Sequence, residues 1–509
     1  MIYRRIVREI WVVVLLATLF ALWVFGQGSG ITITVVRATD LWTADPHNDT
    51  QVTSQSLFHN VFDPLVRVDW NNPTKPLPAL AISWEYVSDT TVVFHLRQGV
   101  KWHDGRDFTS EDVKFTFDRV LDKDNPTKIS VWIAPIVKRV DIIDRYTIKL
   151  ETYRPYAPLF GRLEVLKIIP KQTFLEMGPE AFGQKPVGTG AYVFDEWKKG
   201  EYIRLVANES WWGWTHREKR PDVVIRKSIP EEFTRYAMLE TGEADIVGMI
   251  PPERIPTIEA SGRLRIATTP STRGFFVGMN TWKPPFDDVR VRQAMNYAID
   301  KQLIVDTILL GQATVHPGVC SLSDAGYCPV CMMYEYNPDK ARQLLAEAGY
   351  PNGFEVTLWS PRGKYIKDLE TAEAIAGQLE EIGVKVNVYA PAWPEYWDNF
   401  LAGNMEMYFL SYGGSFPDCD DRIGGHLDGA RRGIYYNSPY SDALIKLEQE
   451  TLDPEKRALI WGALGQYFVQ QAPWIFLWDL NLIYGLSDKI KAWEPVPVEH
   501  IYYWQIEVR

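Results

Sequence analysis

Three carboxylates lie close together in one short segment, Asp418, Asp420 and Asp421. A glycosidase uses two carboxylates on opposite sides of the bond that it breaks, one as an acid and one as a base or nucleophile. A single loop is poorly suited to that geometry, because it delivers its side chains from one direction. The chain also lacks the H-E-x-x-H, G-x-S-x-G and G-x-x-x-x-G-K-[ST] motifs. We therefore expect no catalytic residues and keep a glycosidase-like enzyme only as a remote alternative.

Four cysteines offer a second kind of chemistry, because thiols form disulfides or bind metals. Cys320, Cys328 and Cys331 are closely spaced, and Cys419 follows much later. In an oxidising compartment the first three favour at least one disulfide that closes a small loop. Cys328-x-x-Cys331 would otherwise be half of a zinc site, but no second such pair and no paired histidines lie near it in the sequence. We expect no metal and no cofactor, and the cysteine pairing stays open.

The composition is that of a folded protein with an acidic balance of charge. Hydrophobic residues make up 46% and charged residues 23% of the 509 residues, and the formal net charge is −11. Nucleic acids demand basic surfaces that neutralise phosphates, so no nucleic-acid partner is expected. At roughly 100–200 residues per domain, the length predicts two to four structural units. We expect most of the 20 Trp and 25 Tyr in the core and some in a pocket wall.

The N-terminal segment has the pattern of an export signal. Arg4, Arg5 and Arg8 precede an uncharged apolar run over residues 10–25, and small residues follow at 26–30. This order is typical of a secretory signal peptide. An uncleaved anchor is the alternative, since no clear A-x-A site follows, and a lipid anchor is not expected without a nearby cysteine. Residues 1–30 are therefore predicted to be a signal peptide or N-terminal anchor, which places the protein in the periplasm or on the extracellular face.

Alternating strands and helices are predicted behind these residues. Residues 31–36 are predicted as a strand, and residues 91–96 as a strand that turns back as a hairpin into 100–102. Thr109 is placed to cap a helix, with Asp112 at the capping-box position. Further helices are predicted at 290–307, 339–348, 369–382, 441–450 and 454–470, and further strands at 355–358 and 384–388. The alternation favours an α/β fold with mixed sheets flanked by helices. The apolar strand at 275–280, in a boundary region near 276–285, is a candidate crossing between two lobes.

Six motifs follow one another in the chain in a recognisable order. They are L-A-x-S-W-E at 80–85, F-H-L-R-x-G-V-K-W-H-D-G at 94–105, F-T-S-E-D-V at 108–113, V-G-T-G-A-Y at 187–192, G-E-A-D-I at 242–246 and P-F-D-D-V-R-V-R-Q-A at 285–294. In this order they resemble family 5 of the bacterial extracellular solute-binding proteins, the dipeptide, oligopeptide and nickel-binding group. The resemblance runs from about Asp40 to the C-terminus and says little about the ligand.

The resemblance implies a two-lobe periplasmic-binding-protein fold with an extra subdomain and a ligand cleft between the lobes. Domain I would span 31–277, with the subdomain at about 73–185, and domain II would span 278–484. The segment 485–509 would return to domain I. It also implies an ABC permease and its ATPase as partners, and we expect the receptor to act as a monomer.

Two ligand-binding residues are implied by position. Arg362 falls where similar dipeptide binders hold the α-carboxylate of the ligand, a task that suits the planar fork of arginine. Trp393 matches the family Trp that walls the side-chain pocket. A solvated surface arginine and a tryptophan of the core are the alternative interpretations.

The loop at 411–420 corresponds to the loop that holds the ligand ammonium in peptide binders. Ser415 stands where those proteins place the pairing Asp, and Tyr412 stands where they have Trp. A hydroxyl cannot neutralise a buried ammonium, and an unpaired buried charge is costly. Either Asp418 or Asp420 takes over this task, or the ligand has no free amine there. We name all four as candidate ligand-binding residues.

The sequence therefore predicts an exported solute receptor for di- or oligopeptides or related amino-acid conjugates. An oligosaccharide receptor of the same family is the main alternative, because a pocket rich in Trp and Tyr would favour sugars. Nickel is less attractive, since the eight His show no clustering.

Overall fold

The computed structural model describes residues 30–70, 72–214, 219–329, 331 and 333–509. Residues 1–29, which hold nearly all of the predicted signal peptide or anchor, lie outside the described residues. Among the helices described, none is long and apolar enough to cross a membrane.

The largest sheet runs through the whole molecule. Its strands are β1 (Thr32–Arg37), β8 (Tyr192–Lys198), β9 (Tyr202–Ala207), β10 (Val223–Ser228), β11 (Ile246–Gly248), β12 (Leu264–Met279), β13 (Ala313–Val315), β14 (Glu355–Trp359), β15 (Lys385–Tyr389), β16 (Met407–Gly413) and β17 (Trp474–Ser487). Within the described residues the order is β15-β14-β16-β12-β17-β11-β1-β10-β9-β8, and β13 pairs with β17 off this path. We call the part built on β1 and β8 to β11 the first lobe, and the part built on β14 to β16 the second lobe.

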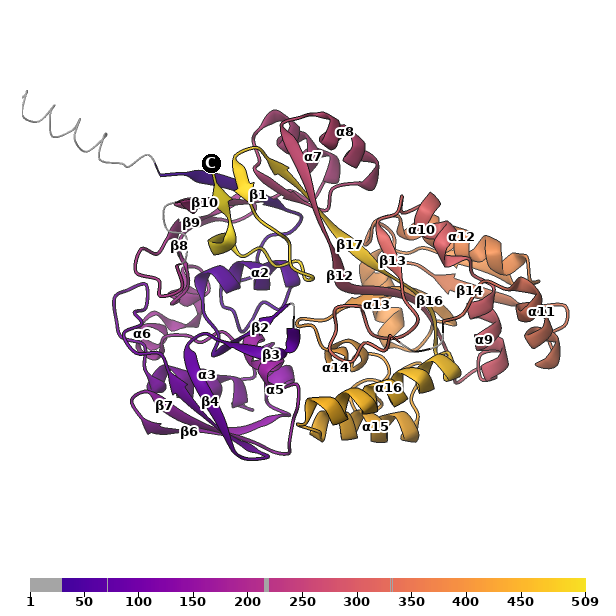
Figure 1. Ribbon diagram of the computed structural model, residues 1–509, viewed down its shortest axis with the longest axis horizontal. Coiled ribbons are helices and arrows are strands. Elements are labelled where there is room, and N and C mark those ends of the chain that lie inside the picture. The colour runs from indigo at the N-terminus through magenta and orange to yellow at the C-terminus, as the bar shows by residue number, and fades with distance from the viewer. Residues whose placement is uncertain (1–29, 71, 215–218, 330, 332) are drawn as a thin grey trace, which may run out of the picture.

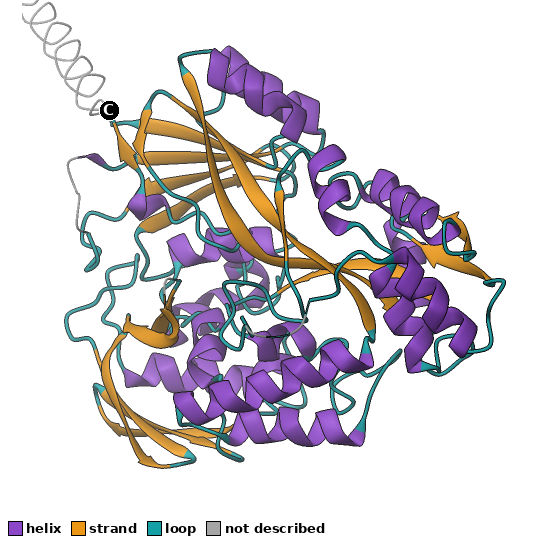
Figure 2. Ribbon diagram, turned by 45° about the vertical axis from the view of Figure 1, so that its right-hand side comes forward, coloured by secondary structure: helices purple, strands orange, loops and turns teal. Residues whose placement is uncertain are grey.

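Two long antiparallel strands, β12 and β17, connect the lobes (Figures 1 and 2). The first part of β12, up to Pro270, pairs with the end of β17 in the first lobe. From Gly274 onward, β12 pairs with β16 and with the beginning of β17 in the second lobe. The ladder shifts register between Pro270 and Gly274, a few residues before the domain boundary predicted at 277/278. The domain boundaries themselves stay predictions.

Smaller sheets adjoin the first lobe, and we count these sheets and the helices that pack on them as part of it. Their strands are β2 (Val66–Asp69), β3 (Asn72–Pro78), β4 (Ala81–Ser88), β5 (Thr91–Leu96), β6 (Val137–Asp144), β7 (Thr147–Thr152), β18 (Ile490–Ala492) and β19 (Glu507–Val508). β4, β5, β7 and β6 form an antiparallel sheet in that order, and β2–β3 and β18–β19 are pairs. The predicted hairpin from 91–96 into 100–102 is wrong, because β4 and β7 occupy both edges of β5. Lys101 instead forms an isolated bridge with Asp107.

Helices flank these sheets (Figure 2). They are α2 (Val52–Val61), α3 (Ser110–Leu121), α4 (Ser130–Ile133), α5 (Leu159–Val165), α6 (Lys171–Phe182), α7 (Glu232–Thr241), α8 (Ile255–Ala260), α9 (Val289–Tyr297), α10 (Lys301–Thr307), α11 (Pro338–Glu347), α12 (Asp368–Glu380), α13 (Trp393–Leu401), α14 (Cys419–Ile423), α15 (Pro439–Glu450) and α16 (Pro454–Gln471). The capping box of Thr109 and Asp112 at α3 is confirmed. The single helix predicted at 290–307 is divided into α9 and α10, because the Asp300 side chain accepts a hydrogen bond from Leu303 N and so begins a new helix.

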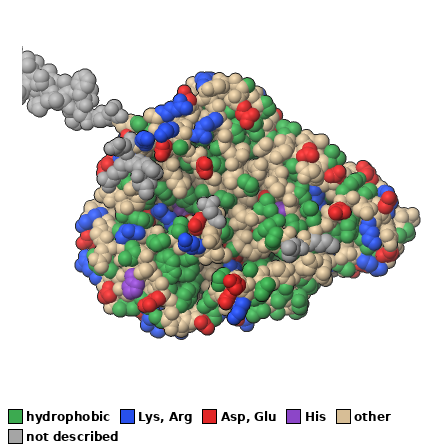
Figure 3. Space-filling model, viewed as in Figure 1, with side chains coloured by type: hydrophobic (Ala, Val, Ile, Leu, Met, Phe, Trp, Pro, Cys, Tyr) green, Lys and Arg blue, Asp and Glu red, His purple; other side chains and the backbone are tan. Residues whose placement is uncertain are grey.

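Each lobe has its own hydrophobic core. Ile33 and Leu205 are fully buried in the core of the first lobe, and Leu358 and Ile375 in that of the second. Acidic and basic side chains are interspersed over the face drawn in Figure 3. The predicted fold class, a two-lobed α/β protein with mixed sheets flanked by helices, is confirmed.

Two disulfides join the four cysteines. Cys328 pairs with Cys331, which confirms the expected disulfide that closes a small loop. Cys320 pairs with Cys419, across a sequence separation of 99 residues. Among the described residues no group of three or more His, Cys, Asp and Glu side chains is arranged to hold a metal ion.

Candidate functional site

A cavity of about 350 Å³ lies where the two lobes meet beside the crossing strands. The first lobe contributes residues 37–39 and 51–53, and the second lobe contributes residues 364–366. Residues 480–484 of β17 form its floor together with Arg273 and Phe275 of β12, and Glu499 reaches it from the C-terminal segment. The cavity therefore exists only where the lobes and the crossing strands come together.

The topology explains why these segments meet. β1 runs parallel to β10 and β11, and Arg37 is its last residue. β14 runs parallel to β15 and β16, and Lys364 lies in the loop between β14 and α12. Ligands of α/β proteins bind at the carboxyl ends of parallel strands, because the following loops are free to vary there. Both lobes present that end to the cavity.

Three cationic side chains and one carboxylate line the cavity. Glu499 bridges two arginines, with Arg37 Nη2 at 3.1 Å from Oε2 and Arg273 Nη2 at 2.9 Å from Oε1. Arg273 also donates to Ser411 Oγ at 3.2 Å. Lys364 Nζ lies 4.5 Å from the ring centroid of Trp393. The charged lining thus has an excess of positive charge that one carboxylate does not balance.

The pKa shifts follow from this arrangement. Burial alone would raise the pKa of Glu499, but Arg273 and Arg37 lower it overall, so the carboxylate stays ionised. Burial, and then the positive charge of Arg273, lower the pKa of Lys364, while Glu499 opposes them. An anionic group placed between Lys364 and Arg273 would stabilise both cations. The cavity is therefore suited to the negatively charged end of a small ligand.

Arg362 and Trp393 lie beside this cavity and are not among its lining residues. Arg362 is exposed, and its backbone N–H donates to the Pro391 carbonyl at 3.1 Å. Trp393 is half-buried at the start of α13, where its ring stacks on Tyr396. The cation over the Trp393 ring is Lys364, two residues after Arg362 in the same loop. The ligand-binding roles of Arg362 and Trp393 stay predictions.

Tyr412 and Ser415 are placed by β16 and the loop that follows it. Tyr412 is half-buried, its ring centroid lies 5.1 Å from that of His426, and burial raises its pKa to about 12. Ser415 donates its backbone N–H to the Asp421 carboxylate at 2.5 Å. Neither residue lines the interlobe cavity. Both roles also stay predictions.

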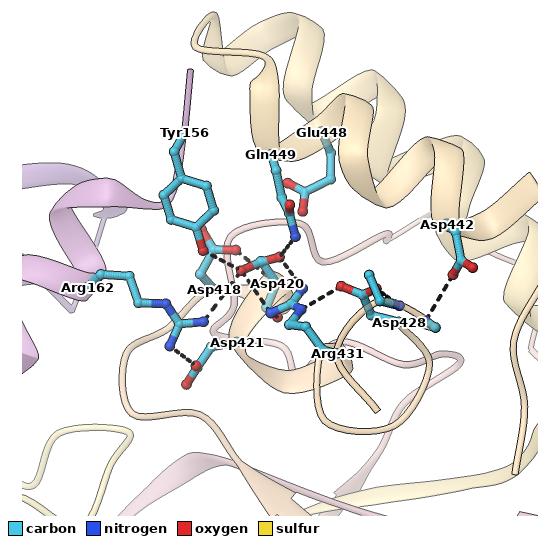
Figure 4. Close-up of polar contacts among 12 residues, drawn as sticks. Tyr156, Arg162, Asp418, Asp420, Asp421, Asp428, Arg431, Asp442, Glu448 and Gln449 are labelled. Carbon is cyan, nitrogen blue, oxygen red and sulfur yellow. Dashed lines mark hydrogen bonds and ion pairs between the residues drawn. The ribbon is translucent and has the colours of Figure 1, made fainter. Parts of the chain in front are cut away.

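Asp418 and Asp420 are paired with cations of the protein itself, and Figure 4 shows the pairing of Asp420 with Arg431. Asp418 accepts two hydrogen bonds from Arg457, at 2.7 and 2.8 Å. Asp420 is fully buried and accepts from Arg431 at 2.6 Å and from Gln449 at 2.7 Å. Burial alone would raise the pKa of Asp420, but Arg431 and Arg162 hold it well below its usual range. Neither carboxylate is left over for a ligand ammonium, and Asp418 borders a different cavity, of about 240 Å³.

The cavity residues that sequence reasoning missed come from distant segments: Arg37, Arg273, Lys364 and Glu499. Only Lys364 could have been found from the sequence, because it lies in the loop after β14 in which Arg362 was already expected to bind the ligand. Arg273 occupies a strand and Glu499 a C-terminal segment, and no motif marks either of them.

Two lobes joined by crossing strands, with a charged cavity between them, define a solute-binding protein. The chain belongs to the family described as "Bacterial extracellular solute-binding proteins, family 5 Middle", which it matches over residues 75–432. The predicted family is therefore confirmed.

Relatives and solved structures agree with this membership. Heme-binding protein A of Haemophilus influenzae is 30% identical over 85% of this chain and 84% of its own length. Glutathione-binding protein GsiB of Salmonella typhimurium is 27% identical over 91% of this chain and 92% of its own length. The ABC transporter-associated periplasmic binding protein DppA of Helicobacter pylori, in complex with the peptide STSA, has a TM-score of 0.80 at 25% identity, covering 94% of this chain and 98% of its own.

Proposed function

We propose that this solute-binding protein is the extracytoplasmic receptor of an ABC importer for short peptides or amino-acid conjugates that carry an anionic group. The ligand binds in the interlobe cavity, with its carboxylate between Arg273 and Lys364. The observation that carries this proposal is the cationic lining of the cavity, in which Glu499 offsets only part of the positive charge. A volume of about 350 Å³ is within the range of small-molecule pockets, roughly 300–1,000 Å³.

The names of the relatives support this class of ligand. Heme, glutathione and the peptide STSA are the ligands in the names and title of three similar proteins. All three are small molecules with carboxylates, which an arginine and a lysine recognise through charge-assisted hydrogen bonds.

An oligosaccharide is a weaker candidate for this cavity. Its aromatic lining consists of Phe275, Tyr365 and Tyr484, and no Trp is among the described lining residues. A pocket rich in both Trp and Tyr was expected to favour sugars, and only the Tyr part of that pattern is present in the described part of this lining. Binding without turnover is also proposed, because Asp418, Asp420 and Asp421 are each paired with an arginine.

Export, partners and oligomeric state are part of the same proposal. A receptor of this class works outside the cytoplasm and delivers its ligand to an ABC permease and ATPase complex in the membrane. We propose that it does so as a monomer, exported by the segment at 1–30.

Isothermal titration calorimetry with a peptide panel tests the function. Glutathione and di-, tri- and tetrapeptides are titrated beside their C-terminally amidated forms and neutral oligosaccharides. We expect binding of at least one peptide with a free carboxylate and weaker binding of its amide. Binding of oligosaccharides alone, or products found by mass spectrometry after incubation, would contradict the proposal.

Lys364→Met tests the anion site itself. We expect at least about tenfold weaker binding of the carboxylate ligand, because a charge-assisted hydrogen bond in a partly buried site contributes roughly 1.5–3 kcal/mol. Lys385→Met, an exposed lysine on β15, is the matched control. Equal affinity of both variants for the free peptide would remove Lys364 from the site.

A further inference from the structure

We propose that an interlobe clamp, formed by Gly161 and Arg162 of the first lobe and Phe416 and Asp421 of the second, holds the two lobes closed without touching the ligand. None of these four residues lines the ligand cavity. The consequence for ligand affinity rests on the proposed function, whereas the consequence for lobe closure does not.

Phe416 is the apolar half of the interlobe clamp. It follows β16 in the second lobe, yet its ring is 2% exposed and packs in a core cluster with Leu159 and Leu163 of α5. A Cβ atom on Gly161 would lie 2.2 Å from Phe416 Cδ2, closer than any real contact. Glycine at 161 is therefore what allows the ring to seat between the lobes.

Arg162 and Asp421 are the polar half. Arg162 Nη1 lies 2.6 Å from Asp421 Oδ1, and the two side chains are only 8% and 6% exposed (Figure 4). The guanidinium carbon also lies 4.9 Å from the Phe416 ring centroid. Because the two side chains come from opposite lobes, the pair can form only while the lobes are closed. Its geometry ties the second-lobe loop to α5.

A row of further contacts extends the same junction. Tyr156 donates its hydroxyl to Asp420 Oδ2 at 3.0 Å, and Ala157 N donates to the Gln449 carbonyl at 2.7 Å. The Gln449 side chain donates to Asp420 at 2.7 Å and accepts from Arg154 at 2.7 Å. Donors and acceptors of the two lobes are thus matched along the junction.

The clamp also explains what the aspartate-rich loop does in this chain. Its carboxylates face Arg162 of the opposite lobe, at 2.6 Å from Asp421 and 3.6 Å from Asp420. The cation that these carboxylates bind is therefore supplied by the protein. A ligand needs no free amine at this loop, which fits a cavity that is cationic.

Closure and affinity are linked through the clamp. The apparent dissociation constant equals the intrinsic one divided by the fraction of receptor that is closed and competent. Contacts that form only in the closed state raise that fraction for every ligand alike. Gly161 and Arg162 are therefore positioning residues, and their loss should weaken chemically different ligands by the same factor.

Small-angle X-ray scattering of the ligand-free protein tests the clamp directly. Gly161→Leu places a wedge against Phe416, and Arg162→Met removes the ion pair. Gly377→Leu on α12, where an added Cβ meets nothing within 4 Å, is the control for the wedge. Arg342→Met, at an exposed arginine of α11, is the control for the arginine. Circular dichroism melts establish that each variant is folded.

We expect a larger radius of gyration for Gly161→Leu and Arg162→Met than for the native protein and both controls. Titration with glutathione and with one peptide ligand should show at least about tenfold loss of affinity, equal for both ligands. Scattering curves that superimpose on that of the native protein, with both variants folded, would overturn the clamp. Since the scattering needs no ligand, this outcome is separate from a failure of the proposed function.

Discussion

Arg457 of α16 connects two carboxylates beside the cavity of about 240 Å³. It donates to Asp418 through two hydrogen bonds and lies 2.8 Å from Glu448 Oε2, and Asp418 also caps α14 by accepting from Asp420 N. A buried arginine left with one partner missing is strongly destabilising. At the scale of single residues, this is a role in stability, and it differs from the ligand contact that the sequence predicted for Asp418.

Asp418→Ala should therefore lower the free energy of unfolding by about 3–5 kcal/mol, the usual cost of breaking a buried ion pair. Urea denaturation measures this loss, and Asp398→Ala on the exposed side of α13 is the control. Ligand affinity measured under folding conditions should be unchanged. A stable variant that binds ligand more weakly would return Asp418 to the binding site.

His426 makes stability depend on pH. Burial, and then Arg432, lower the pKa of its imidazole from 6.5 to about 3, and neither ring nitrogen has a hydrogen-bond partner among the described residues. Between pH 6.5 and 3 the unfolded chain binds a proton that the native protein does not, so stability is lost as the pH falls through this window. At pH 5 the loss from this one group is about 2 kcal/mol.

The variant His426→Phe isolates this effect, because its apolar ring fits among Phe276, Phe400 and Trp474. The free energy of unfolding, measured in urea at pH 7.5 and pH 5, should fall less on acidification in the variant, by about 2 kcal/mol. His95→Phe on β5 controls for the substitution. An equal fall in the native protein and His426→Phe would refute the account of this histidine.

At the scale of elements, local sequence patterns were enough to place five helices closely. Helices α11, α12, α15 and α16 begin within two residues of the predicted positions, and α3 begins at its predicted cap. The strand pairing was predicted wrongly where the paired strands are distant in sequence. The hairpin after β5 failed because the true neighbours, β4 and β7, compete for the same edges. Asp300 could have been recognised as a helix cap, and this would have divided α9 from α10.

The disulfide between Cys320 and Cys419 joins the loop that carries Phe416 and Asp421 to the segment between β13 and α11. A disulfide lowers the conformational entropy of the unfolded chain and so stabilises the native state. This contribution is about 5 kcal/mol for a sequence separation of 99 residues and about 2 kcal/mol for the short Cys328–Cys331 loop. The double variant Cys320→Ala/Cys419→Ala should therefore lose more stability in urea denaturation than Cys328→Ala/Cys331→Ala. An equal or reversed order would show that loop length does not govern these two bonds.

At the scale of the whole molecule, the family motifs were sufficient to predict two lobes and a cleft, since those motifs lie in turns and helices that build the fold. They were insufficient for the cavity. Arg37, Arg273, Lys364 and Glu499 come from four segments that only the complete topology brings together, and their neighbours in sequence carry no common pattern. The aspartate loop was the most conspicuous charged feature; Asp421 pairs with Arg162 between the lobes, whereas Asp418 pairs with Arg457 inside the second lobe.

A crystal structure of the protein with a calorimetrically identified peptide bound would show where the ligand lies. We expect the ligand in the cavity of about 350 Å³, with its carboxylate within hydrogen-bond distance of Arg273 or Lys364 and the interlobe clamp closed. A ligand held instead in the second cavity beside Trp461, or on the surface of one lobe alone, would contradict this expectation.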